Sequence, residues 1–85
     1  MDDEIKKYLI AVDKTIGQKI EQSRILFNIS RKELAKVIDV SPQQLYKYEN
    51  GKNRISVGRL SLIAKKFYKD LNYFIDKKDK PQRTI

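Results

Sequence analysis

The side chains best suited to recognition chemistry in this sequence lie on a short helix that we predict at residues 42–49. Its outward positions are Gln43, Gln44, Tyr46 and Lys47. A glutamine side chain can form two hydrogen bonds with adenine, and a lysine can donate to guanine, in the major groove of DNA. This helix face therefore suits the reading of base edges, although such a row of polar residues is also typical of a merely solvated surface.

Catalytic and metal-binding chemistry is poorly represented in the chain. Its 85 residues include neither cysteine nor histidine, so the usual general base, nucleophiles and zinc ligands are missing. The acidic residues are scattered and mostly adjoin lysine or arginine, which does not suit a magnesium site. We therefore expect neither an enzyme nor a site for a metal or cofactor.

The charge balance indicates an anionic partner. The 19 lysine and arginine residues outnumber the 11 aspartate and glutamate residues, which gives a formal net charge of +8. A basic surface on a small domain is typical of nucleic-acid binding, and we expect double-stranded DNA as the partner. No apolar run approaches the roughly 20 residues of a membrane span, and the opening Met-Asp-Asp-Glu does not resemble a signal peptide. These observations predict a cytoplasmic protein without membrane contact.

Two short predicted helices position the polar face. Ser30, with a glutamate three positions later, has the pattern of a capping box and predicts a helix over residues 31–38. Ser41 is a good N-cap for the next helix, and Pro42 suits its first position, where a backbone N–H would have no partner. Two helices joined by so short a connection are typical of a helix-turn-helix, whose second helix enters the major groove.

Helical periodicity also covers the flanking sequence. Apolar residues recur mostly at steps of three or four through residues 5–27, and Gly17 weakens this stretch enough to predict a break. Further helices are predicted after the N-cap Ser56 and over residues 71–75. The divisions that we expect are a helical extension at 1–14, a helix-turn-helix domain at 15–75 and a charged, disordered tail at 76–85.

Several segments of the predicted domain match one known family in order and spacing. They are IGQKI at 16–20, ISRKELA at 29–35, VSPQQLYKYENG at 40–51, SVGRL at 56–60 and IA at 63–64. In these segments the chain resembles the lambda-repressor-like family, the Cro- and Xre-type helix-turn-helix proteins. The resemblance implies an all-α fold with a compact five-helix bundle. It also implies a sequence-specific DNA-binding transcriptional regulator, in the first place a repressor.

The resemblance further implies roles for individual residues. Base readers map to Pro42, Gln43, Gln44, Tyr46 and Lys47, and phosphate contacts map to Arg31, Asn50, Lys52, Asn53 and Arg54. Two positions depart from the family pattern, which commonly has glutamine in place of Arg31 and a polar reader in place of Pro42. Arg31 can still form a charge-assisted bond to phosphate, whereas Pro42 can offer only apolar contact, for instance to a thymine methyl group.

An ion pair between Arg24 and Glu49 is another implication of the resemblance. Family members often pair an arginine of the first helix with the glutamate that closes the third. Arg24 interrupts an otherwise apolar helix face, where an unpaired charge would be costly. The alternative interpretation is two unrelated charges on solvated faces.

The sequence also permits hypotheses about assembly. One reading helix covers few base pairs, so we expect a homodimer on two half-sites. Tyr73, Phe74 and Ile75 lie on a helix too short to bury all three, which predicts a dimer interface there. The apolar stripe that includes Ile5 and Leu9 could join this interface, fold back onto the fourth helix or bind a protein partner. The alternative function is therefore an antitoxin or adaptor module built on the same fold.

Overall fold

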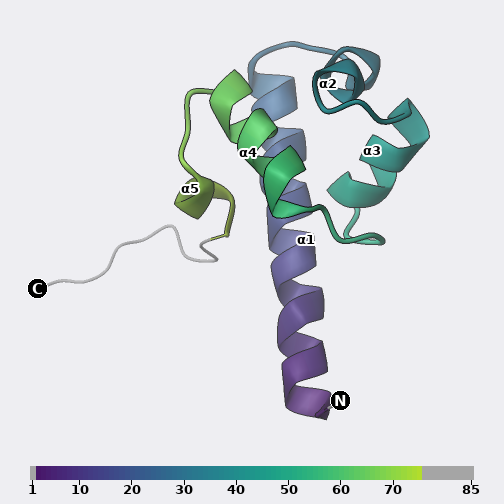
Figure 1. Cartoon of the computed structure of the whole chain (residues 1–85), viewed down its shortest axis with the longest axis vertical. Coiled ribbons are helices and arrows are strands. Elements are labelled where there is room, and N and C mark those ends of the chain that lie inside the picture. Colours follow the sequence, from purple (N-terminus) through teal and green to yellow (C-terminus); the bar gives the residue numbers. More distant parts are fainter. Residues whose placement is uncertain (1, 76–85) are drawn as a thin grey trace, which may run out of the picture.

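The computed structural model describes residues 2–75 of the 85-residue chain, and the secondary structure in that range is entirely helical. The helices are α1 (Asp3–Leu26), α2 (Arg31–Val37), α3 (Pro42–Glu49), α4 (Val57–Lys66) and α5 (Leu71–Ile75). Figure 1 shows α2 to α5 gathered around the C-terminal half of α1, while its N-terminal half projects beyond them. The predicted all-α, five-helix fold is confirmed for this range. The predicted tail at 76–85 lies outside the described residues.

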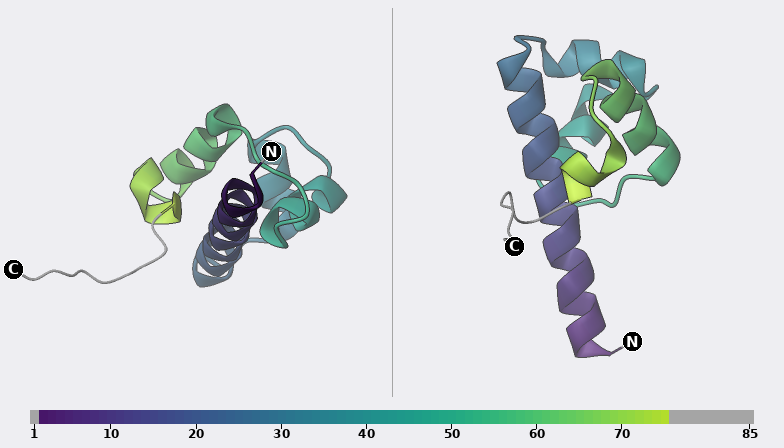
Figure 2. Two further views of the ribbon diagram at one scale, coloured as in Figure 1. Left: turned by 90° about the horizontal axis from the view of Figure 1, so that it is seen from below. Right: turned by 90° about the vertical axis from the view of Figure 1, so that its left-hand side faces the viewer.

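A single hydrophobic core joins the five helices. Helix α3 packs against α1 and α2, and α5 packs against α1 and α4 (Figure 2). The largest apolar side chains that are at most 1% exposed are Ile20, Leu34, Ile38, Leu45, Ile63, Phe67 and Phe74. Each helix supplies at least one of these side chains or is followed directly by one. The helix-turn-helix pair is therefore held by contacts with the rest of the domain rather than by its own turn.

Serine residues begin three of the helices, as the sequence predicts. The hydroxyl oxygens of Ser30, Ser41 and Ser56 accept hydrogen bonds from the backbone N–H groups three residues later, at 3.0, 3.0 and 3.1 Å. Each bond satisfies one of the donors that the first turn of a helix leaves without a partner, and is typically worth about 1 kcal/mol. These caps fix the first residues of α2, α3 and α4.

Residues with left-handed backbone conformation follow the ends of four helices. Asn28, Asp39, Gly51 and Tyr68 have φ angles of 57°, 59°, 70° and 59°. Asparagine and glycine adopt this conformation readily, so Asn28 and Gly51 suit the positions just after the ends of α1 and α3. The sequence contains no comparable signal at Tyr68, because a tyrosine rarely adopts a positive φ.

The predicted break at Gly17 is wrong, because α1 runs without interruption through this residue. Gly17 is instead buried where α1 meets the end of α3. A Cβ atom added there would lie 2.5 Å from the carbonyl oxygen of Glu49. Glycine is therefore required by the close approach of two backbones rather than by a turn. Since α1 is continuous, its N-terminal half projects from the bundle and does not fold back onto α4 (Figure 1). The apolar stripe is divided as a result, because Ile5 and Tyr8 are exposed whereas Val12 packs against the core.

Two features are absent from the described part of the chain. Between residues 2 and 75 no helix has the length and apolar character required to cross a membrane. In the same range no group of three or more acidic, histidine or cysteine side chains is arranged so that it could hold a metal ion.

Candidate nucleic-acid interface

The outward face of α3 is the exposed half of the helix-turn-helix. Its inner side is anchored by Leu45, which is fully buried, and by Tyr48, which is half-buried against the core. Pro42, Gln43 and Lys47 are exposed on the opposite side. In Figure 1 α3 lies at the outer edge of the bundle, so an extended partner can reach this face without moving another helix.

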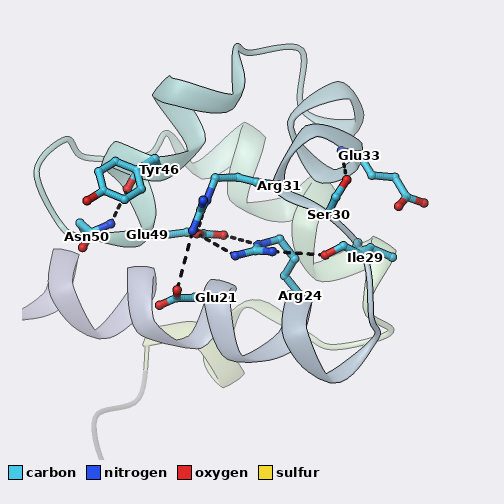
Figure 3. A network of polar contacts seen from close by, with 9 residues as sticks. All are labelled: Glu21, Arg24, Ile29, Ser30, Arg31, Glu33, Tyr46, Glu49 and Asn50. Atoms are coloured by element: carbon cyan, nitrogen blue, oxygen red, sulfur yellow. Dashed lines mark hydrogen bonds and ion pairs between the residues drawn. The ribbon is translucent and has the colours of Figure 1, made fainter.

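A buried ion pair fixes the end of α3 to α1. The Nε atom of Arg24 donates to Oε2 of Glu49 at 2.8 Å, and its Nη2 atom donates to Oε1 at 3.4 Å. The glutamate side chain is 0% exposed and the arginine side chain 11%. The remaining Nη1 atom of Arg24 donates to the carbonyl oxygen of Ile29 at 3.2 Å, just before α2. The predicted ion pair is therefore present, and it connects α1, the start of α2 and the end of α3 (Figure 3).

A second arginine completes this network, and the sequence did not predict its role. The Nε atom of Arg31 donates to Oε1 of Glu49 at 2.9 Å, and its Nη2 atom lies 3.8 Å from Oε2 of Glu21. The guanidinium group also lies 5.2 Å from the centre of the Tyr46 ring. Figure 3 shows Arg31 between these groups. Arg31, predicted as a phosphate contact, thus has partners within the chain and supports the reading helix from its α2 side.

The predicted base readers fall into two groups. Gln43 and Lys47 project from α3 into solvent, and the Tyr46 side chain is 46% exposed beside Arg31. Gln44 is half-buried, and its Nε2 atom donates to Oδ1 of Asn53 at 3.0 Å. The structure therefore gives Gln44 a local role, since it ties α3 to the loop that follows.

The predicted phosphate contacts in the loop after α3 are exposed, but several are held by internal bonds. The side-chain amide of Asn50 donates to the carbonyl oxygen of Tyr46 at 2.9 Å, and that of Asn53 donates to the carbonyl oxygen of Lys52 at 2.9 Å. The Nε atom of Arg54 lies 3.1 Å from a carboxylate oxygen of Asp13 on α1. Sequence reasoning missed this pair because its residues are far apart along the chain.

The predicted dimer residues on α5 do not share one environment. Phe74 is 0% exposed in the core of a single chain, so its assignment to an interface is wrong. The α5 helix packs against α1 and α4 and buries Phe74 between them, and this packing depends on segments far from α5 in the sequence. Tyr73 is half-buried, with the Nζ atoms of Lys19 and Lys69 each 4.6 Å from its ring centre. Ile75 is exposed, and a dimer contact stays a prediction for it and for Tyr73.

Comparisons with known proteins agree with this architecture. A family model described as helix-turn-helix matches residues 20–74. An uncharacterized HTH-type transcriptional regulator of Rickettsia prowazekii is 50% identical over 74 residues, which cover 84% of this chain and 57% of that protein. An uncharacterized transcriptional regulator in the ATPase CF(0) region of Rhodospirillum rubrum is 44% identical over 63 residues, which cover 74% of this chain and 58% of that protein. The chain thus spans a little over half the length of these relatives.

A solved structure has the same fold. The crystal structure of the clp gene regulator ClgR from Corynebacterium glutamicum superposes with a TM-score of 0.70 over 74% of this chain and 67% of that one, at 21% sequence identity. The family match covers α2, α3, α4 and most of the core described above. Both curated relatives are named as transcriptional regulators. The chain belongs to the lambda-repressor-like helix-turn-helix family of DNA-binding transcriptional regulators.

Proposed function

We propose that this chain binds specific sequences of duplex DNA through α3 and thereby represses transcription. The observation that carries the proposal is an exposed polar face on a helix whose C-terminal residue is fixed by buried charges. Gln43 and Lys47 are exposed, whereas Glu49 is fully buried between two arginines. Specific readout requires donors and acceptors that are held in place before DNA arrives, because ordering them on binding would oppose affinity.

The spacing of the two exposed side chains suits base pairs about two steps apart. Gln43 and Lys47 are four residues apart on one helix face, a rise of about 6 Å along the axis. Base pairs follow one another at about 3.4 Å, so the two side chains would reach positions roughly two base pairs apart. Glutamine pairs best with adenine and lysine with guanine, which sets the expected preference.

The loop after α3 would supply contacts that do not depend on sequence. Lys52 and Arg54 are exposed there, and Arg31 exposes one third of its side chain at the start of α2. Contacts of this kind position a protein on the DNA backbone and make binding strongly dependent on salt. Arg54 would contribute less than Lys52, because Asp13 already neutralises part of its charge.

The proposed regulator acts as a homodimer. A symmetric pair doubles the number of base pairs read and places two half-sites about one helical turn, ~34 Å, apart. Ile75, which is exposed beside the half-buried Tyr73, is the proposed contact on α5. Figure 1 places α5 and α3 on opposite flanks of α1, so an α5 contact would leave both reading helices exposed.

Selection of bound sequences from random duplex DNA tests the proposal, followed by fluorescence anisotropy on the selected site. We expect Gln43→Ala and Lys47→Ala each to lose about 1–3 kcal/mol of affinity and to relax preference at one base position. The matched control is Lys66→Ala, which removes the same charge from an exposed position on α4 and should leave the preference unchanged. With about four to six phosphates contacted, the logarithm of affinity should fall with the logarithm of salt at a slope of about −4 to −5. Selection that yields no common sequence, or a flat salt response, would contradict the proposal.

A protein-binding role, as in an antitoxin or adaptor, is the second candidate. It is supported by the N-terminal half of α1, where Ile5 and Tyr8 are 52% and 61% exposed on a segment that projects from the bundle. Apolar side chains in such a position are typical of partner-binding helices. Co-purification with the product of a neighbouring gene, abolished by Ile5→Asp but not by Gln43→Ala, would support this role.

A further inference from the structure

Large apolar side chains are exposed where α1 and α4 end side by side (Figure 1). Phe27 and Phe67 are the C-cap residues of these two helices, and their rings are in edge contact with centroids 4.9 Å apart. Leu26 precedes this contact on α1 and is 80% exposed, whereas Tyr68 follows it after α4 and is 87% exposed. Phe27 itself is 43% exposed. We call Leu26, Phe27 and Tyr68 the end patch.

The exposed ring of Tyr68 is held in a backbone conformation that costs free energy. Its φ angle of 59° lies in the left-handed region, which glycine adopts at little cost and a tyrosine rarely adopts. Because most of the residue is exposed, the ring gains little from packing within the chain. Strained residues of this kind cluster at ligand-binding and other functional sites. Tyr68 is therefore a candidate for a contact outside the chain.

The surroundings of the end patch are basic. The two segments that meet there, residues 22–32 and 57–69, contain no acidic residue. The next acidic residue along the chain, Asp70, accepts a hydrogen bond from the backbone N–H of Tyr73 at 3.3 Å. The exposed lysines in the last turn of α4 and just after it are Lys65, Lys66 and Lys69. An apolar patch with a polar rim is typical of an interaction site, and a basic rim matches a partner of negative charge.

We infer that the end patch binds an acidic segment of a partner protein, whose apolar side chains cover Leu26 and Tyr68 and whose carboxylates face the lysines of α4. The inference goes beyond the proposed function, because the patch shares no residue with the reading face. Figure 1 and Figure 2 place the last turn of α4 on the flank of α1 away from α3. A partner can therefore occupy the end patch while α3 is bound to DNA.

A protein segment fits the end patch better than an anionic membrane does. The strength of membrane binding grows with the apolar area that is buried. The end patch has three side chains at the ends of two helices, rather than a stripe along one amphipathic helix. A short segment of a partner can cover an area of this size, so we treat lipid binding as an outcome that the test must distinguish.

Selection of peptides on the whole chain tests the inference. Short random peptides displayed on phage are selected on the immobilised protein, and a selected peptide is synthesised with a fluorescent label for anisotropy titrations. We expect the selected sequences to combine leucine or aromatic residues with aspartate or glutamate. Replacement of the acidic residues of the peptide by lysine should weaken binding about ten-fold or more, because like charges then face the rim.

Three variants locate the peptide on the protein. Tyr68→Gly removes the ring and relieves the left-handed strain, so it should weaken peptide binding about ten-fold or more without lowering the melting temperature. Leu26→Asp should weaken binding from the α1 side. Val57→Asp is the matched control, because Val57 is 72% exposed at the other end of α4, and it should leave peptide binding unchanged. Circular dichroism melts show whether each variant is folded, and a saturating DNA duplex should not change the affinity for the peptide.

Other outcomes would overturn the inference. A selected peptide that binds Tyr68→Gly and Leu26→Asp as tightly as the parent chain occupies another surface. Selection that yields no peptide, or peptides without acidic residues, would mean that the patch does not bind an acidic segment. If phosphatidylglycerol vesicles bind the parent chain but not Tyr68→Gly, and no peptide is selected, the patch is a lipid-binding surface instead. A lower melting temperature for Tyr68→Gly would show that the ring stabilises the fold, which removes the reason to expect an external contact.

Discussion

Replacement of Arg24 by alanine should destabilise the domain substantially, because it removes the buried ion pair that fixes α3 to α1. The Arg24 side chain is 11% exposed and donates twice to Glu49, whose side chain is fully buried. It also satisfies the carbonyl oxygen of Ile29. The methyl group of alanine provides none of these bonds. Among residues 2–75, the ion pairs of Glu49 are with Arg24 at Oε2 and with Arg31 at Oε1, so Oε2 would lose its cation.

The size of the loss follows from what remains around Glu49. Removal of one partner from a buried ion pair costs about 3–5 kcal/mol when the other charge is left alone. Here Arg31 still donates to Oε1 at 2.9 Å, so the carboxylate keeps one cation. We therefore expect a loss of about 2–3 kcal/mol, which in a domain of this size lowers the melting temperature by roughly 8–24 °C.

Two further variants separate burial from charge. The Arg31 side chain is 33% exposed, and solvent screens much of its attraction to Glu49, so Arg31→Ala should cost only about 1 kcal/mol. The double variant Arg24→Met with Glu49→Leu replaces the pair by apolar groups of similar volume and should recover most of the loss of Arg24→Ala. Thermal and urea unfolding monitored by circular dichroism measure all three.

The reasoning would be refuted by either of two results. A melt of Arg24→Ala within about a degree of the parent chain would mean that the pair contributes nothing to stability. A loss for Arg31→Ala as large as that for Arg24→Ala would mean that burial does not set the strength of these contacts. Failure of the double variant to recover stability would point to the Ile29 bond as the dominant contribution.

Three more predictions follow from individual contacts. Gly17→Ala should destabilise the domain by about 1–2 kcal/mol, because the added methyl group meets the backbone of α3. Gly58→Ala is the matched control, since a Cβ atom there has nothing within 4 Å, and it should be neutral or stabilising by up to about 1 kcal/mol in the same thermal melts. Lys52→Ala should reduce the slope of the logarithm of DNA affinity against the logarithm of salt by about one in magnitude. Arg54→Ala should reduce this slope by less, because Asp13 already pairs with Arg54, and equal reductions in anisotropy titrations would contradict this ordering. Ile75→Asp should dissociate the proposed dimer and leave the monomer folded, whereas a parent chain that is monomeric in sedimentation equilibrium, both free and on DNA, would exclude the dimer.

The sequence predicts the helix starts well because their signals are local. A serine and the backbone N–H three residues later suffice to place the beginnings of α2, α3 and α4. The ends at Asn28 and Gly51 are equally local, since both residues adopt positive φ at low cost. Such signals need no knowledge of which helix packs on which.

Contacts between distant segments were not predictable in the same way. A glycine inside a helical pattern indicates either a break or a close approach, and only the position of α3 against Gly17 decides between them. Likewise, Arg31 and Asp13 carry charges whose partners come from other segments of the chain, the helices α1 and α3 for Arg31 and the loop after α3 for Asp13. Phe74 was misassigned for a related reason, since its burial depends on α1 and α4 rather than on the short α5.

Glu49 gains from both of the arginines that surround it. An acidic residue in the last turn of a helix meets the negative end of the helix dipole, which is unfavourable by about 0.3–1 kcal/mol, and full burial adds a larger desolvation penalty. A single exposed cation would not offset both. Two guanidinium groups, from α1 and α2, surround the carboxylate and also place positive charge at that end of α3. The C-terminal end of α3 is thereby anchored at a point shared by three helices, and the proposed reading residues Gln43 and Lys47 project into solvent from a helix whose orientation is already set.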